Sequence, residues 1–454
     1  QGETWFRVPE SIKVNLIGKM NEGVYAKDLA LWIIGMIGSS GADYMSIEYH
    51  GDGVKSMSVA DRMTVANLAS EMGAKTAVFP ADQILCDYIG YQTDGVWADP
   101  DATYVRVLDI NLSELFPVVA APHHVDNVKA VSEVSGTKIH QALVGTCTNG
   151  RIEDLRIAAK VLDGKSVAKH VQLLVIPASQ EIYMQAMQEG LIAIFMNAGG
   201  NVLAPSCGPC LGTGQGIPAD NTVVISTANR NFKGRMGNPQ SEVYLASPAT
   251  VAWSAIKGEI TDPRGITEKN LYPYHAEQSK TVDVKSGDDR YAKSVWNYAD
   301  VDNLNTDQMF AGNLTYNINS SEGDKIMPYL FKGFDDSFAE RVQKDDILVA
   351  GANFGCGSSR EHPAVGLGYA GVKAVICKSV NRIFYRSAVN QGLPILVVPE
   401  AVDAFKQGAV LTIDFQKGVI SIDSQQFYFA PLPDKLMGIF DSHGLVNYVK
   451  SIVV

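Results

Sequence analysis

Basic charge, cysteine and long apolar runs are all scarce in this sequence, and each scarcity excludes a class of protein. Its 38 lysines and arginines are outnumbered by 49 aspartates and glutamates, for a net charge of −11. This argues against nucleic-acid binding, which needs a basic surface. Six cysteines in 454 residues fit a reducing compartment rather than a disulfide scaffold. The longest apolar run, residues 29–37, is too short to cross a bilayer.

We therefore expect no membrane and no nucleic-acid partner, and a cytoplasmic location, or the mitochondrial matrix in a eukaryote. No secretory or transit segment is apparent. The chain opens at Gln1 without a methionine, so we expect a processed product or one piece of a larger protein.

Strand and helix patterns alternate along the chain. The first stretch predicts strands at 12–16, 44–49 and 76–79, with helices at 26–37 and 59–72. Such alternation argues for parallel sheets covered by helices, which is an α/β fold. Two stretches lack periodicity and predict connections between domains. The predicted division is one domain over residues 1–100, a second over 101–262, a linker over 263–298 and a third domain over 299–454.

Three of the cysteines stand in short glycine-containing motifs. Cys147 lies in a GTCTNG turn between a predicted strand and a predicted helix, and Cys207 and Cys210 form a CGPC pair. Three thiolates fit an iron–sulfur cluster that leaves one iron without a protein ligand, and an open metal position allows chemistry. The backbone N–H groups of a strand-to-helix turn can stabilise an anionic cluster.

Other interpretations of these cysteines stay open at the level of the residues. A CxxC pair is also typical of a redox dithiol, although glycines rather than a strong helix-forming sequence follow Cys210. A structural zinc site would need about four ligands, and three are visible. Cysteines that merely pack in a core would not require Gly and Pro between them.

Two further segments combine arginine with side-chain donors. Residues 226–235 contain Arg230 and Arg235, and residues 353–362 contain Ser358, Ser359 and Arg360. Arginine forks suit bidentate capture of carboxylates. Taken alone, the first segment is as well explained by a solvated loop, and the second by an ordinary helix cap with Ser359 as the N-cap residue. Together with a metal cluster, they indicate dehydration and rehydration of a hydroxy-di- or tricarboxylic acid.

Four segments in this order resemble the aconitase superfamily of iron–sulfur hydro-lyases, over nearly the whole chain. They are residues 145–150 (GTCTNG), 206–210 (SCGPC), 229–235 (NRNFKGR) and 355–362 (GCGSSREH). Residues 151–155 and Cys356 are most similar to the branch of 3-isopropylmalate dehydratase and homoaconitase, whose large and small subunits are often separate. The resemblance implies three-layer α/β domains of aconitase type, followed by a swivelling β/α domain similar to the small subunit.

The resemblance also implies roles for individual residues. Cys147, Cys207 and Cys210 would hold a 4Fe-4S cluster, and Ser358 or Ser359 would abstract the proton as an alkoxide. Asn67 and Glu71 would organise the hydroxyl group and water at the open iron, although by spacing alone they could be a solvated pair one helical turn apart. The residues implied to line the small anionic carboxylic-acid substrate are Arg230, Arg235, Arg360, Asn229 and Asp307.

The implied function is a hydro-lyase that isomerises a 2-hydroxy di- or tricarboxylic acid such as 3-isopropylmalate or homocitrate. Alternatives are an aconitate hydratase acting on citrate and isocitrate, a non-catalytic cluster-binding fragment, and an RNA-binding relative. The sequence departs from the family in two ways. The family's N-terminal domain with catalytic His and Asp residues does not precede Gln1, which predicts a separate N-terminal fragment or subunit. Asn313 stands where relatives often have a basic residue, so the substrate choice stays open.

Overall fold

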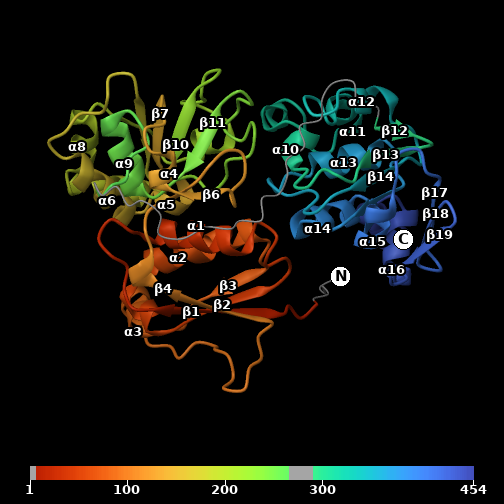
Figure 1. Cartoon of the computed structure of the whole chain (residues 1–454), viewed down its shortest axis with the longest axis horizontal. Helices are drawn as coiled ribbons and strands as arrows, with labels where there is room; N and C mark the ends of the chain where they lie inside the picture. Colours follow the sequence, from red (N-terminus) through yellow and green to blue (C-terminus); the bar gives the residue numbers. More distant parts are fainter. Residues whose placement is uncertain (1–6, 265–289, 454) are drawn as a thin grey trace. The chain divides into compact units, whose positions relative to one another are not determined.

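The computed structural model describes residues 7–264 and 290–453. Contacts divide the chain into two compact units, Gln1–Glu277 and Gln278–Val454, and each unit has its own sheets and cores (Figure 1). The side chain of Asn313 lies outside the described residues. None of the described helices combines the length and the apolar character that a membrane span requires.

The first unit begins with a four-stranded parallel sheet in the order β3-β2-β1-β4. Its strands are β1 (Ser11–Ile17), β2 (Ser46–His50), β3 (Thr76–Val78) and β4 (Arg106–Asn111). Its helices are α1 (Ala26–Ile37), α2 (Val59–Leu68), the 3-10 helix η2 (Ala69–Met72) and α3 (Gln83–Ile89). In β1 the buried side chains alternate with partly exposed ones, because one face of the strand packs on the core.

The second sheet of this unit has seven strands in the order β6-β5-β11-β10-β7-β8-β9. They are β5 (Val118–Ala120), β6 (Val128–Ala130), β7 (Gln141–Gly145), β8 (Gln172–Ile176), β9 (Asn201–Val202), β10 (Val223–Ser226) and β11 (Glu242–Leu245). The strands from β11 to β9 run parallel, whereas β5 and β6 pair antiparallel. Every residue of β7 is buried, as expected for the centre of a sheet covered on both faces.

Helices of the second sheet follow its parallel strands, and α1 and α2 also reach it. The helices are α4 (Val131–Val134), α5 (Thr146–Asn149), α6 (Ile152–Leu162), α7 (Gln180–Gln188), α8 (Leu191–Asn197), the 3-10 helix η4 (Gly208–Leu211) and α9 (Pro248–Lys257). In Figure 1, α1 and α2 lie between the first sheet and the elements of the second, and α1 contacts β5 while α2 contacts α5. Both sheets therefore contribute to the surroundings of α5.

The second unit has a five-stranded sheet in the order β12-β13-β14-β15-β16 and a three-stranded antiparallel sheet, β17-β18-β19. Its strands are β12 (Tyr291–Ala292), β13 (Val295–Tyr298), β14 (Ile347–Ala350), β15 (Ala374–Cys377), β16 (Ile395–Val397), β17 (Leu411–Asp414), β18 (Val419–Ile422) and β19 (Gln425–Tyr428). Along β14, Leu348 belongs to one core cluster, whereas Ile347 and Val349 belong to another. The sheet is thus buried on both faces.

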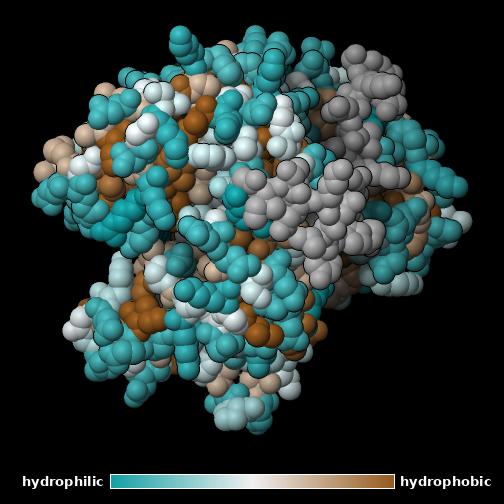
Figure 2. All heavy atoms as spheres, turned by 60° about the vertical axis from the view of Figure 1, so that its left-hand side comes forward, coloured by the Kyte–Doolittle hydropathy of each residue, from teal (hydrophilic) through white to brown (hydrophobic). Residues whose placement is uncertain are grey.

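Short helices connect and cover these strands. They are α10 (Thr306–Met309), α11 (Gly323–Ile326), α12 (Ser337–Arg341), α13 (His362–Tyr369), α14 (Arg382–Asn390), α15 (Pro399–Ala404), α16 (Asp434–Asp441) and α17 (Leu445–Val453), with the 3-10 helices η5 (Gly312–Tyr316) and η6 (Met327–Tyr329). The predicted α/β class with parallel sheets is confirmed. On the face shown in Figure 2, hydrophilic residues dominate and apolar ones form scattered patches.

The predicted domain limits and the observed elements differ at two places. The predicted break after residue 100 falls just before β4, which pairs with β1 of the first sheet, so the polar stretch before it is a connection within one sheet. The predicted linker 263–298 includes β12 and β13 of the second unit, and its residues 265–289 lie outside the described residues. The division into three domains stays a prediction.

Candidate active site

The three motif cysteines gather beyond the carboxyl ends of β7 and β9, two parallel strands that β8 separates in the second sheet. Cys147 lies in α5 directly after β7, whereas Cys207 and Cys210 flank the start of η4, which follows β9. Partial burial raises the pKa of the Cys207 thiol, and the charges of Cys210 and Cys147 raise it further, while Arg235 lowers it. All three cysteines are free thiols. The carboxyl edge of parallel strands is where open α/β sheets bind ligands.

Gly145 makes the tight turn that carries Cys147. Its φ is 123°, a conformation that residues with a Cβ rarely adopt. A Cβ there would lie 2.0 Å from the carbonyl oxygen of Ile176 in β8. The hydroxyl group of Thr227 donates to the Gly145 carbonyl over 3.1 Å and accepts from the Gly145 N–H over 2.8 Å. The turn after β7 is therefore bound to the chain that leaves β10.

The cysteine group fits a cluster better than a single ion. Among residues 7–264 and 290–453, no three or more His, Cys, Asp or Glu side chains are placed to hold one metal ion, which counts against the tetrahedral zinc interpretation. Each thiolate of an iron–sulfur cluster binds a different iron, so its ligands need not converge. In addition, Nε of Arg235 is buried without a hydrogen-bond partner, so an anionic group beside Cys207 would satisfy it.

The segment after β10 brings Asn229 and Arg230 to the same edge, where residues from α2 and η2 meet them. Nδ2 of Asn67 and Nδ2 of Asn229 both donate to Oγ1 of Thr148, over 2.7 and 2.9 Å. Nε of Arg230 donates to both carboxylate oxygens of Glu71, over 2.9 and 3.0 Å. Glu71 is therefore buried against the candidate residue Arg230, whereas Asn67 reaches Thr148 while its side chain stays exposed to solvent.

Lys27 of α1 is a site residue that the sequence motifs do not reveal. Only 1% of it is exposed, and its Nζ donates to the carbonyls of Thr227 and Ala228 over 3.1 and 2.9 Å and to Oδ1 of Asn229 over 3.4 Å. Burial lowers the pKa of Lys27 to about 8, opposed by the charges of Cys210, Glu71, Asp154 and Cys147. The charged residues Lys27 and Asp28 at the start of the mostly apolar stretch 26–37 were the available signal.

The second unit holds the other candidate residues around the start of α10. Arg360 pairs with Asp307 through its Nη2, and both side chains are largely buried. Nε of Arg360 and Oδ2 of Asp307 are buried without a hydrogen-bond partner. The Ser358 N–H donates to Oγ1 of Thr306 over 2.8 Å, which anchors the serine loop. Ser358 is partly buried, whereas Ser359 is exposed.

The interpretation of Ser359 as an N-cap is wrong. Helix α13 begins at His362 with Glu361 at its N-cap position, because Pro363 favours the first turn of a helix. His362 is buried rather than exposed, with its ring 5.1 Å from that of Phe310 and Nε2 2.9 Å from the carbonyl of Ile318. The serines thus lie in a loop before the helix, where Gly357 has a φ of 102°.

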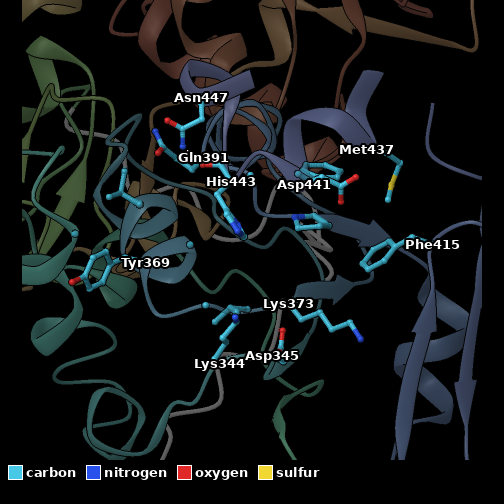
Figure 3. A pocket seen from close by; sticks show the side chains of 18 of the residues that line it. Lys344, Asp345, Tyr369, Lys373, Gln391, Phe415, Met437, Asp441, His443 and Asn447 are labelled. Carbon is cyan, nitrogen blue, oxygen red and sulfur yellow. Dashed lines mark hydrogen bonds between the residues drawn. The ribbon is translucent and has the colours of Figure 1, made fainter. Parts of the chain in front are cut away.

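A separate cavity of about 810 Å³ lies elsewhere in the second unit. Figure 3 shows Lys344 and Asp345 on one side of it and His443 and Asn447 on the other. None of the sequence-predicted site residues lines it. The cysteine group belongs to the first unit and the Asp307–Arg360 pair to the second.

Comparisons with known proteins agree with this arrangement of motifs. The chain matches the aconitase family (aconitate hydratase) over residues 1–138 and 125–258, and the aconitase C-terminal domain over residues 269–401. It is 52% identical over 268 residues to 3-isopropylmalate dehydratase large subunit 2 of Archaeoglobus fulgidus, covering 58% of this chain and 64% of that protein. It is 48% identical over 269 residues to a probable methanogen homoaconitase large subunit of Methanosarcina mazei, covering 58% and 68%.

A solved structure of 3-isopropylmalate dehydratase from Methanocaldococcus jannaschii is 36% identical, with a TM-score of 0.30, and covers 33% of this chain and 88% of that one. The chain spans about 64% of the length of the Archaeoglobus relative. The two family matches lie in the order of the two units, and the first covers more than half of the chain. The chain belongs to the aconitase family.

Proposed function

We propose that the chain is the cluster- and substrate-binding part of a hydro-lyase that isomerises a 2-hydroxy di- or tricarboxylic acid, such as 3-isopropylmalate or homocitrate. The observation that carries this proposal is the gathering of Cys147, Cys207 and Cys210 beside Arg235 at one sheet edge. The names of the relatives support the two example substrates.

A 4Fe-4S cluster bound by the three cysteines would supply Lewis acidity at an iron without a protein ligand. The chain's own residues would bind and orient the acid. The unpartnered Nε atoms of Arg235 and Arg360 each suit a carboxylate group, because a buried guanidinium N–H without an acceptor is costly.

Proton transfer is assigned to the serine loop. Ser358 would take the proton from the carbon next to the hydroxyl-bearing carbon, and Ser359 would hydrogen-bond the substrate. The contact between Thr306 and the backbone of Ser358 supports this, because a general base must be held in position. Arg360, two residues further on, would favour the alkoxide form of Ser358 by its charge.

The length of the relatives beyond this chain would be supplied as a further segment or as a separate N-terminal fragment or subunit. The group that protonates the leaving hydroxyl is assigned to that part. The prediction is that the full-length protein, or this chain mixed with its missing part, turns over the substrate, and that this chain alone binds the cluster.

The cluster is tested by anaerobic reconstitution of the chain with iron and sulfide, followed by iron analysis, absorption and Mössbauer spectra. We expect about four irons per chain, and loss of the cluster spectrum in Cys147→Ser, Cys207→Ser and Cys210→Ser. Cys86→Ser is the matched control, because Cys86 is a free cysteine in α3 outside the group. Stoichiometric zinc with no iron would contradict the proposal.

The substrate is tested by a panel of 3-isopropylmalate, homocitrate, citrate and a methylated malate, followed by the absorbance of the unsaturated intermediate. We expect Ser358→Ala to lower kcat by at least about 100-fold, because it removes the base. Ser359→Ala should act mainly on KM. Equal losses of kcat in the two variants would contradict the assignment of the base to Ser358.

A further inference from the structure

The direction of the hydrogen bonds around Cys147 can be derived from Lys27. Nζ of Lys27 has three partners, two backbone carbonyls and Oδ1 of Asn229, and each of them can only accept. The two backbone carbonyls are acceptors in any case, and burial lowers the pKa of Lys27 only to about 8, so Lys27 is the ammonium at pH 7. Burying this charge in α1 is costly unless its hydrogen bonds are made, and here all three are.

Lys27 fixes the orientation of the Asn229 amide. Because an ammonium group has no acceptor, the atom that faces it must be the amide oxygen. The amide nitrogen of Asn229 therefore points the other way, to Oγ1 of Thr148 at 2.9 Å. This removes the usual ambiguity between the oxygen and the nitrogen of an asparagine side chain.

Thr148 in turn has only one hydrogen-bonding function left. Its Oγ1 accepts from Asn229 and from Nδ2 of Asn67, and a hydroxyl group has two acceptor lone pairs and one hydrogen. Both lone pairs are occupied, so the hydroxyl group must donate its hydrogen elsewhere. Sγ of Cys147 lies 3.7 Å from Oγ1, within reach of a hydrogen bond to sulfur.

We infer that Lys27, Asn229 and Thr148 form a relay that directs the O–H group of Thr148 at the sulfur of Cys147. Asn67 contributes by donating to the second lone pair of Thr148 Oγ1, so the hydroxyl hydrogen cannot point toward Asn67. The inference rests on the proposed function, since it concerns a cysteine assigned to the cluster. Hydrogen bonds to cysteine sulfur raise the reduction potential of an iron–sulfur cluster and help to retain it, and a nearby positive charge, such as the Lys27 ammonium, also raises the potential. Lys27 and Thr148 are thus positioning residues that tune the site without binding substrate.

The test is the midpoint potential and the stability of the reconstituted cluster in the full chain. Thr148→Val keeps the shape of the side chain and removes the hydroxyl group, so the potential should shift to a more negative value and the cluster should be lost about 10-fold faster or more in air. Thr148→Ser retains the donor and should stay near the wild type. Lys27→Met should shift the potential in the same direction as Thr148→Val.

Thr213→Val is the matched control. The hydroxyl group of Thr213 lies three residues beyond Cys210 but donates to the carbonyl of Gly208 over 3.3 Å rather than to sulfur. Equal potentials for Thr148→Val, Thr213→Val and wild type would overturn the inference, and so would a shift in Thr148→Ser as large as in Thr148→Val.

Failure of the proposed function gives a different result. In that case the wild-type chain shows no cluster spectrum at all. The direction of the Thr148 hydroxyl group is then determined in the cluster-free protein by neutron diffraction, which locates the deuterium on Oγ1 of Thr148. A deuterium directed at Sγ of Cys147 supports the relay, and one directed at Asn67 or Asn229 overturns it.

Discussion

Arg360 and Asp307 have only 13% and 5% of their side chains exposed. Arg230 and Glu71, with 18% and 5% exposed, repeat this arrangement in the first unit. A buried pair of this kind is weak evidence for added stability, because desolvation offsets much of the attraction. Its effect is to hold the planar guanidinium in one orientation, as recognition of a carboxylate requires.

Removal of one partner should therefore be more harmful than removal of both. We expect Asp307→Asn to destabilise the second unit by about 3 kcal/mol, because the Arg360 charge is left buried without its counterion. Adding Arg360→Met should recover part of this loss. Urea unfolding of the four proteins of this double-mutant cycle measures the coupling.

Glu322→Gln is the control for that cycle. It breaks the Lys325–Glu322 pair, whose side chains are 58% and 33% exposed, and an exposed pair contributes little. If Asp307→Asn lowered the free energy of unfolding by as little as Glu322→Gln, the claim that Asp307 compensates a buried Arg360 charge would be wrong.

Sequence motifs pointed to the cysteines, Asn229, Arg230, Arg235 and the serine loop, but not to Lys27 or Thr148. The motif residues carry recognisable chemistry at short spacing, whereas Lys27 contacts acceptors about 200 positions away. Such a contact depends on the packing of one sheet against another, which local pattern does not encode. The role of Thr148 as a donor to Cys147 could be inferred only once both asparagine donors were located.

At the scale of the elements, hydrophobic periodicity was a good guide where one strand or helix packs on one core. The helix predicted over 26–37 is α1, and the strand predicted over 12–16 is contained in β1. The helix predicted over 59–72 instead tightens into a 3-10 turn at Ala69, which carries Glu71 to Arg230. The hydrophobic periodicity of 59–72 could not show the 3-10 turn, because the turn accompanies a contact of Glu71 with a residue 159 positions away.

The turn between β7 and α5 has a strict backbone requirement at Gly145. We expect Gly145→Ala to destabilise the first unit severely and to abolish cluster binding, because its Cβ would meet the backbone of Ile176 at 2.0 Å. Thermal unfolding and iron content measure the two effects.

Gly164→Ala separates the steric clash from the cost of the backbone conformation. Gly164 also has a positive φ, 66°, but a Cβ there would meet nothing within 4 Å. It should therefore cost only about 1–2 kcal/mol and leave iron binding intact. If Gly145→Ala and Gly164→Ala lost similar stability and iron, the close approach of Gly145 to β8 would not be the reason that a glycine is needed there.

At the scale of the whole molecule, a pH dependence of stability follows from two buried aspartates of the first unit, Asp28 and Asp154. Asp28, next to Lys27 in α1, accepts from the N–H groups of Tyr25 and Val118 over 2.9 and 3.2 Å. Burial raises the pKa of Asp28 to about 7, against 3.8 for an ordinary aspartate. Burial likewise raises the pKa of Asp154 to about 6. The folded chain thus binds protons that the unfolded chain releases.

The free energy of unfolding should accordingly fall as the pH rises from about 4 to about 7, and Asp28 should contribute at most about 4 kcal/mol to that fall. Asp28→Asn cannot titrate, so its stability relative to wild type should improve between pH 5 and pH 8. Urea unfolding at both pH values measures this difference. Asp163→Asn, at an exposed position, should show the same pH dependence of unfolding free energy as the wild type. If Asp28→Asn also showed that pH dependence, the raised pKa of Asp28 would be contradicted.

The placement of Cys147 after β7 and of Cys207 after β9 has a consequence for how variants are interpreted. These strands are separated in the sheet by β8, so the ligand set exists only after three distant segments have paired. Binding of the proposed cluster would then follow folding, because the three thiols are far apart in the unfolded chain. A variant that weakens this sheet at a distance from the cysteines would therefore lower the iron content of the reconstituted protein, although all three proposed ligands are still present.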